Sequence, residues 1–97
     1  MHASIRRAKG KPGTMPEMTR IIEDGYVDRL AEIPGFQAYY VVDLGNDELA
    51  TISIFEDEAG AHKSADLARD VVSGPLAPHI QSPLDVNNGK VVVHKKR

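Results

Sequence analysis

The 97 residues fit a single domain over residues 1–97 rather than two domains. A composition of 41% hydrophobic and 27% charged residues is that of a globular protein and excludes a disordered chain. The formal net charge is −2 and the twelve Lys and Arg residues are spread thinly, so the concentrated basic face of a nucleic-acid-binding protein is not expected. The absence of cysteine excludes disulfide bonds, thiol nucleophiles and thiolate metal sites.

The sequence also argues against export and against membrane insertion. Polar residues, among them His2, Arg6 and Arg7, stand where a signal peptide needs an apolar run. No stretch approaches the ~18 apolar residues of a membrane span. We therefore expect a cytoplasmic protein without a membrane partner.

The first two elements are indicated by alternation and by helical spacing. Residues 2–9 alternate weakly between apolar and polar side chains, which predicts a short strand that is partly exposed on one face. After a break at residues 10–13, the capping-box pattern of Thr14 and Glu17 precedes a helix over residues 15–33. The apolar stripe of this helix consists of Met18, Ile22, Tyr26, Leu30 and Ile33.

A β-hairpin is expected in the middle of the chain. Pro34 and Gly35 are typical of a type II turn that ends the helix. Residues 36–44 and 49–55 are rich in β-branched and aromatic residues, and only the short segment 45–48 connects them. Two such runs with a short connection predict an antiparallel strand pair.

The last part of the chain predicts a second helix and a final strand. Asp57 is a good N-cap, small apolar residues follow at helical spacing, and Gly74 with Pro75 ends the helix. Three prolines within residues 75–85 predict an irregular loop with room for one helical turn, and residues 91–94 predict the last strand. The order β-α-β-β-α-β predicts an α+β, ferredoxin-like domain with a four-stranded antiparallel sheet and its helices on one face.

The strand patterns favour a homodimer. Two helices cover only one face of a sheet, so strands with one wet face should alternate strictly between apolar and polar residues. Residues 39–42 and 91–93 are instead apolar or aromatic at consecutive positions, and both faces of the sheet carry apolar side chains. The simplest cover for the second face is the same face of another copy. The alternative is that the second face is partly apolar and solvated.

Three segments resemble the relatives of the antibiotic-biosynthesis monooxygenases, which are small dimeric α+β barrel proteins. The segments are PGFQAYYVVDLG (34–45), ISIFEDEAGA (52–61) and GKVVVH (89–94). The resemblance implies a dimeric α+β barrel with a pocket between sheet and helices. The wider superfamily to which these relatives belong includes cofactor-independent oxygenases, haem-degrading enzymes and small isomerases, so the resemblance implies a range of activities. The chain has no Trp, and its three Asn residues lie in predicted turns, so only the position of the pocket carries over.

Two functions from different classes follow. The first is a cofactor-independent monooxygenase or isomerase that acts on a small aromatic or apolar substrate, with no cofactor expected. The second is a non-catalytic domain that binds or senses a small ligand. An RNA-recognition domain has the same order of elements, but it needs a basic segment with aromatic residues on the central strands, which this chain lacks.

A few side chains could carry chemistry in such a pocket. We predict His79, in the proline-containing loop, and Tyr40 as catalytic residues, since imidazole and phenol groups can both place a proton. We predict Tyr26, Tyr39 and Arg69 as ligand-binding residues. The alternative for each is a structural or solvent-exposed role. The four His residues do not form a pair with metal-ligand spacing, so no metal site is expected.

Overall fold

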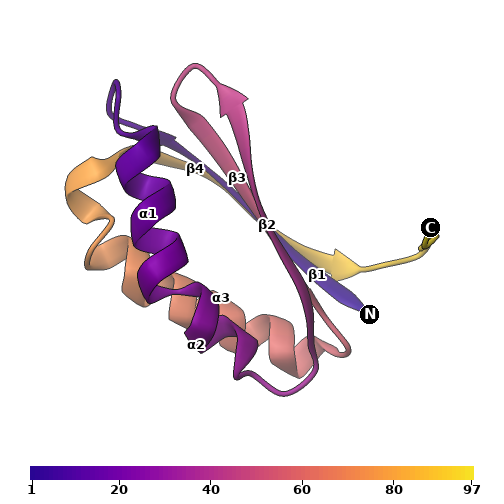
Figure 1. Ribbon diagram of the computed structural model, residues 1–97. Coiled ribbons are helices and arrows are strands. Elements are labelled where there is room, and N and C mark those ends of the chain that lie inside the picture. Colours follow the sequence, from indigo (N-terminus) through magenta and orange to yellow (C-terminus); the bar gives the residue numbers. More distant parts are fainter.

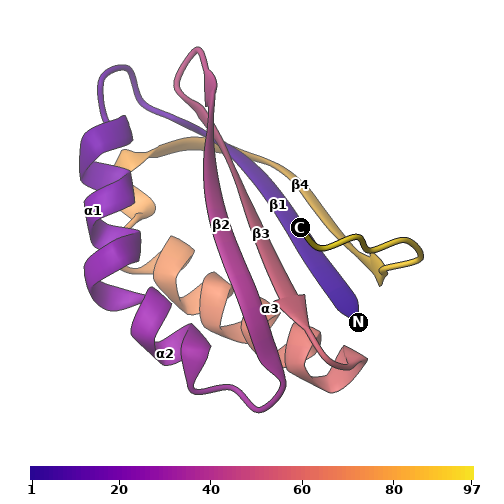
Figure 2. The same ribbon diagram turned by 45° about the vertical axis from the view of Figure 1, so that its right-hand side comes forward.

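A four-stranded antiparallel sheet with all helices on one face forms the domain (Figures 1 and 2). The computed structural model describes residues 1–97, apart from the side chains of residues 83 and 84. The strands are β1 (His2–Gly10), β2 (Phe36–Gly45), β3 (Glu48–Phe55) and β4 (Ile80–Lys90), in the spatial order β2-β3-β1-β4. The helices are α1 (Met15–Gly25), α2 (Val27–Ala31) and α3 (Glu58–Ser73), followed by the 3-10 turn η1 (Ala77–His79). The predicted α+β, ferredoxin-like class is confirmed.

The two long helices begin differently. The Asp57 carboxylate accepts a hydrogen bond from the Gly60 amide at 3.1 Å, so the predicted N-cap of α3 is confirmed. The predicted capping box of α1 is wrong, because the backbone of Thr14 is already helical (φ −93°, ψ −1°), whereas an N-cap hydroxyl needs an extended residue. The Thr14 hydroxyl donates instead to the Lys11 carbonyl at 2.7 Å.

The predicted helix over residues 15–33 is interrupted at Tyr26. This residue has φ −115° and separates α1 from the five-residue α2. Its amide still donates to the Ile22 carbonyl at 3.0 Å, and its carbonyl accepts from the Leu30 amide at 2.9 Å. Gly25, a poor helix former, immediately precedes the interruption. The apolar stripe therefore stays on one side across the break.

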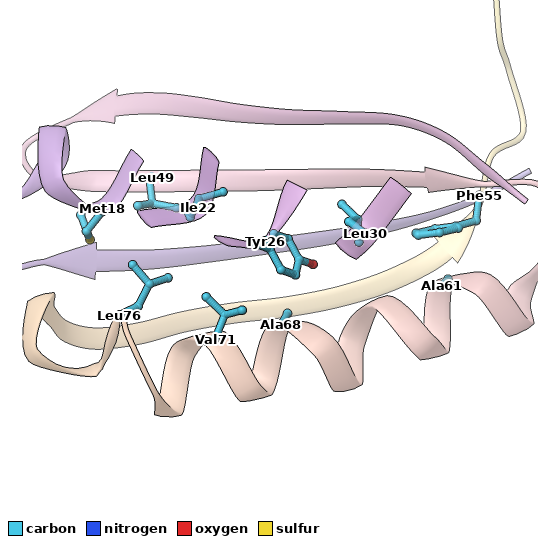
Figure 3. Packing of buried hydrophobic residues seen from close by; sticks show 10 residues of the cluster. All are labelled: Met18, Ile22, Tyr26, Leu30, Leu49, Phe55, Ala61, Ala68, Val71 and Leu76. Atoms are coloured by element: carbon cyan, nitrogen blue, oxygen red, sulfur yellow. The ribbon is translucent and has the colours of Figure 1, made fainter. Parts of the chain in front are cut away.

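The main core lies between the sheet and the helices (Figure 3). Met18, Leu30 and Phe55 are fully buried, and the Phe55 ring meets the Phe36 ring edge to face at 5.8 Å between centroids. α3 can approach the sheet closely because its inner side carries Gly60 and small residues such as Ala61. Burial of this kind is the main favourable contribution to folding.

The register assigns each strand residue to a face of the sheet. Ser4, Arg6 and Ala8 of β1 face the helices, and Ser4 pairs with Ser53 while Arg6 pairs with Thr51. Ser4 is completely buried, whereas Ile5 on the other face is 41% exposed. The side of β1 that the helices cover is therefore its polar side.

The predicted last strand, residues 91–94, is wrong. The fourth strand is β4, which includes Pro83 and the Asn88-Gly89 pair that predicted a loop and a turn. β4 hydrogen-bonds to β1 alone and is an edge strand, where proline is tolerated because half of the backbone groups need no partner in the sheet. The predicted single helical turn is present as η1. The Val91 amide still donates to the Met1 carbonyl at 2.9 Å, and the C-terminal tail beyond it runs away from the domain in Figure 1.

Candidate functional site

An apolar cavity of about 60 Å³ lies between the helix-facing side of the sheet and the helices. Residues from both layers line it, because α1 contributes one wall, α3 another, and the central strands the floor. Its apolar lining includes Ile22, Leu49, Ala68, Val71 and Leu76. Ligand pockets in proteins are commonly concave, mostly apolar spaces with a few polar groups, and this cavity has that character.

Tyr26 and Tyr39 provide phenol groups at the cavity. Their rings meet edge to face with centroids 5.5 Å apart, which fixes both rings against each other. The Tyr26 hydroxyl donates to the Ser64 carbonyl at 3.5 Å. Burial raises the pKa of Tyr26 and, more strongly, the pKa of Tyr39, so both phenols are protonated near neutral pH. Neither tyrosine therefore acts as a base in this pH range.

Arg6 brings a positive charge to the same cavity. Its Nη2 atom is buried and has no hydrogen-bond partner among the residues that the structure describes. Burial lowers the pKa of Arg6, yet an arginine remains charged at any physiological pH. A buried guanidinium nitrogen without a partner is unusual, because removing a polar atom from water costs free energy unless a hydrogen bond compensates for it.

Two serines lie beside Arg6 on the helix-facing side of the sheet and form a polar strip with it. Ser4 and Ser53 are paired across β1 and β3, both are completely buried, and neither Oγ atom has a partner within the described part of the chain. Tyr39 pairs with Ser53 from the other side. Polar groups therefore run across three neighbouring strands beneath the helices.

A surface groove of about 290 Å³ adjoins the cavity and opens between α3, β1 and β4. Arg6, Ala68, Val72 and Ile80 line both spaces, so Arg6 stands where the cavity meets the groove. Arg69 lines the groove from α3, and its Nη1 atom lies 3.2 Å from the Asp66 carboxylate.

Two predicted site residues lie elsewhere. Tyr40 is on the opposite face of β2 from Tyr39, is 56% exposed and borders a second hollow between β2 and α1, which shares Ile22 and Tyr39 with the cavity. His79 belongs to η1, where its carbonyl accepts a hydrogen bond from the Lys11 amide at 2.8 Å, and it is not among the residues that line the cavity. Of the predicted site residues, Tyr26 and Tyr39 line the cavity and Arg69 lines the adjoining groove. Tyr40 and His79 line neither of these two spaces.

Sequence reasoning missed Arg6 as a site residue. The alternation in residues 2–9 places Ser4 and Arg6 on one side, but it does not show that the helices cover this side. Ala3 and Ile5 are the signal that could have identified Arg6. They pair with Ile54 and Ile52 on the face away from the helices, so the residues that alternate with them, Ser4 and Arg6, face the helices.

The described residues show no metal site and no membrane span. No three His, Asp or Glu side chains gather as ligands in this part of the molecule. None of its helices combines the length and the apolar character that crossing a bilayer requires.

No protein-family model and no curated protein matches the chain. Solved structures do match it over nearly its whole length. A Nitrosomonas europaea protein of unknown function is 18% identical, with a TM-score of 0.82 over 99% of this chain and 93% of its own. A Chloroflexus aurantiacus protein provisionally assigned as an antibiotic biosynthesis monooxygenase is 15% identical, with a TM-score of 0.74 over 98% and 96%.

A second provisionally assigned antibiotic biosynthesis monooxygenase, from Nitrosomonas europaea, is 8% identical, with a TM-score of 0.77 over 94% of this chain and 89% of its own. At such low identities the likeness establishes a fold and leaves the activity open. The chain therefore has the fold of the antibiotic-biosynthesis-monooxygenase-like structures, as its sequence segments indicated.

Proposed function

We propose that the chain binds a small aromatic or otherwise apolar molecule in the cavity between sheet and helices. The observation that carries this proposal is the apolar cavity itself, which meets a polar strip and opens into a groove. The cavity alone is smaller than the roughly 300–1,000 Å³ of common ligand sites, so a ligand would extend past Arg6 into the groove.

The catalytic form of the proposal is a cofactor-independent monooxygenase. In such a reaction an ionisable substrate supplies the electrons, and the protein orients it and excludes water. A substrate methylene and O2 would give a carbonyl and water: one oxygen atom enters the product, and the other leaves with the two methylene hydrogens. Fold likeness to the two provisionally assigned monooxygenases supports this chemistry as an analogy.

The residues at the cavity restrict how such a reaction could begin. The side chains that line it include no carboxylate and no imidazole within the described part of the chain. Tyr26 and Tyr39 are protonated near neutral pH and can donate a hydrogen bond but cannot accept a proton. The substrate must therefore arrive ionised or ionise at Arg6. A role for Tyr40 or His79 would have to be exerted from outside this cavity.

The same absence of a base favours the second candidate, a binding domain without catalysis. Such a domain needs only the apolar walls, the two phenols and the charge of Arg6. Turnover separates the two candidates, whereas ligand affinity alone does not.

Oxygen consumption tests the catalytic form. With a hydroxylated anthrone, whose methylene becomes a quinone carbonyl, a monooxygenase takes up O2 faster than buffer does. Ala68→Phe, which places a ring in the cavity, should abolish this uptake, whereas Ala31→Phe at an exposed position of α2 should not. Binding of an aromatic ligand without O2 uptake would support the binding domain. Uptake that persists in Ala68→Phe would contradict a reaction in this cavity.

We also infer that the chain forms a homodimer through the open face of its sheet, which is the face away from the helices. Ile5, Tyr40, Val42 and Leu44 on β1 and β2 lie on this face and are 39–56% exposed. Neighbouring positions carry Ile52 and Ile54 of β3. Several exposed large apolar side chains on one face are unusual on a monomer, and an identical face is self-complementary across a two-fold axis.

A further inference from the structure

We propose that Arg6 binds an anionic oxygen, so that the ligand of the cavity is an aromatic acid: a ring that carries a carboxylate or a phenolate. This inference rests on the proposed ligand-binding cavity and adds the chemical class of the ligand. It assigns a role to a residue of β1 that lines both the mostly apolar cavity and the adjoining groove.

One nitrogen of the Arg6 guanidinium lacks a hydrogen-bond partner. Nη2 of Arg6 is buried without a hydrogen bond to any residue that the structure describes. Arginine presents its donors as a planar fork that suits a carboxylate, and charge-assisted hydrogen bonds of this type are among the strongest in proteins. A ligand anion would satisfy this atom and offset the desolvation of the charge.

Nearby groups do not neutralise the charge of Arg6. Tyr26 and Tyr39 interact with it, but burial keeps both phenols neutral near pH 7. Arg69 on α3 is a further positive charge, and its own partner is the Asp66 carboxylate at 3.2 Å. The carboxylate that lines the groove from β4, Asp85, is held by Arg7 at 2.6 Å. Among the residues that the structure describes, Arg6 therefore has no ion-pair partner.

The walls of the cavity beyond the guanidinium are mostly apolar. Val71 and Leu76 are buried and line the cavity from the helix side, and Ile22 lines it from α1. The Tyr39 ring lines the same space and offers an aromatic surface to a ligand ring. A free inorganic anion would gain nothing from these walls, whereas an aromatic acid uses both the walls and the charge.

Calorimetric titration with 2-naphthoate and with 2-naphthamide tests the proposal, since the two probes share the ring and differ in charge. We expect the wild-type chain to bind the carboxylate about tenfold more tightly than the amide. Arg6→Gln should bring the two dissociation constants together and leave that of the amide unchanged. Arg20→Gln, the same change at an exposed arginine of α1 that pairs with Glu17, should behave as the wild type.

A measurement on the unaltered chain keeps the test independent of how Arg6→Gln folds. The phenolate of 4-nitrophenol absorbs visible light, so its ionisation can be followed in the bound state. Arg6 should lower the apparent pKa of the bound phenol by about one pH unit, because a nearby positive charge favours the anion. If the chain prefers 2-naphthoate but does not lower the pKa of bound 4-nitrophenol, the site is specific for carboxylates. If it lowers this pKa but does not prefer 2-naphthoate, the site is specific for phenolates.

Two outcomes would overturn the proposal, and they can be told apart. If wild type binds both naphthalene probes equally and bound 4-nitrophenol ionises as it does in buffer, Arg6 is not an anion site although the cavity still binds ligands. If none of the probes binds, the proposed ligand-binding function fails together with the role of Arg6.

Discussion

At the scale of single residues, the cavity combines the partly buried charge of Arg6 with two phenols, the buried Tyr26 and the half-buried Tyr39. Arg6, Tyr26 and Tyr39 come from β1, the break between α1 and α2, and β2, and none lies near another in sequence. Their burial has opposite effects on the two residue types, because it lowers the pKa of the cation and raises the pKa of each phenol.

The raised pKa of Tyr39 predicts a dependence of stability on alkaline pH. An unfolded tyrosine loses its proton near pH 10, whereas folded Tyr39 holds its proton to higher pH. The contribution of Tyr39 to folding is therefore complete below about pH 10 and is lost as the pH rises toward its folded value. In urea titrations from pH 9 to 11, the free energy of unfolding of Tyr39→Phe should fall less steeply than that of the wild type. Parallel slopes would contradict the buried environment of this phenol.

The tyrosines could be predicted from the sequence, but Arg6 could not. Tyr26 belongs to a helical apolar stripe, and two adjacent tyrosines in a strand must face opposite sides, so one of them had to face the helices. An arginine in a weakly alternating strand predicts a solvent-exposed face. Its burial follows only from the central position of β1 between β3 and β4.

At the scale of secondary-structure elements, the approach of α3 to β3 depends on one glycine. A Cβ atom at Gly60 would stand 2.7 Å from Cδ1 of Phe55, whose ring is completely buried. Gly60 is also the residue whose amide donates to the Asp57 cap. The beginning of α3 is thus fixed by a cap and by a close contact with the aromatic core.

Gly60→Ala should destabilise the fold by about 1–3 kcal/mol, because the fully buried Phe55 ring has to move. Gly25→Ala is the matched control, since a Cβ atom there meets nothing within 4 Å. That substitution should raise the free energy of unfolding by up to about 1 kcal/mol through helix propensity alone. Urea denaturation checks both values. Equal effects of the two substitutions would contradict the close packing at Gly60.

The elements differ in how far the sequence predicts them. The hairpin and α3 are predicted within a residue or two because their turn residues, strand composition and N-cap all agree. β4 was missed because it is an edge strand that contains Pro83 and an Asn-Gly pair, features that usually indicate a loop. The valines at 91–93 predicted a strand because valine favours strands. They lie beyond the end of β4 instead, and Val92 and Val93 are 85% and 84% exposed.

At the scale of the whole molecule, the sheet has two apolar faces and the helices cover one of them. The proposed homodimer covers the other and leaves the cavity of each copy on its own helix side. The exposed valines at 92 and 93 add further apolar surface beyond the end of β4. A chain of this size gains substantially from such burial, since small domains bury a modest fraction of their surface alone.

Val42→Lys tests the homodimer. It places a charge among the exposed apolar side chains of the open face, on the edge strand β2, and should shift the chain from dimer to monomer in sedimentation-velocity runs at micromolar concentration. Ala31→Lys adds the same charge at an exposed position on the helix side and should leave the dimer intact. A wild-type chain that sediments as a monomer at this concentration would contradict the proposed association.

The central claim is that a small aromatic acid occupies the space between sheet and helices. Intermolecular nuclear Overhauser effects between 2-naphthoate and the methyl groups of the protein measure this directly. The account predicts contacts from the ring protons to Val71 and Leu76, which line the cavity. Contacts confined to Val42 and Leu44, on the open face of the sheet, would place the ligand on the wrong side of the molecule and contradict the account.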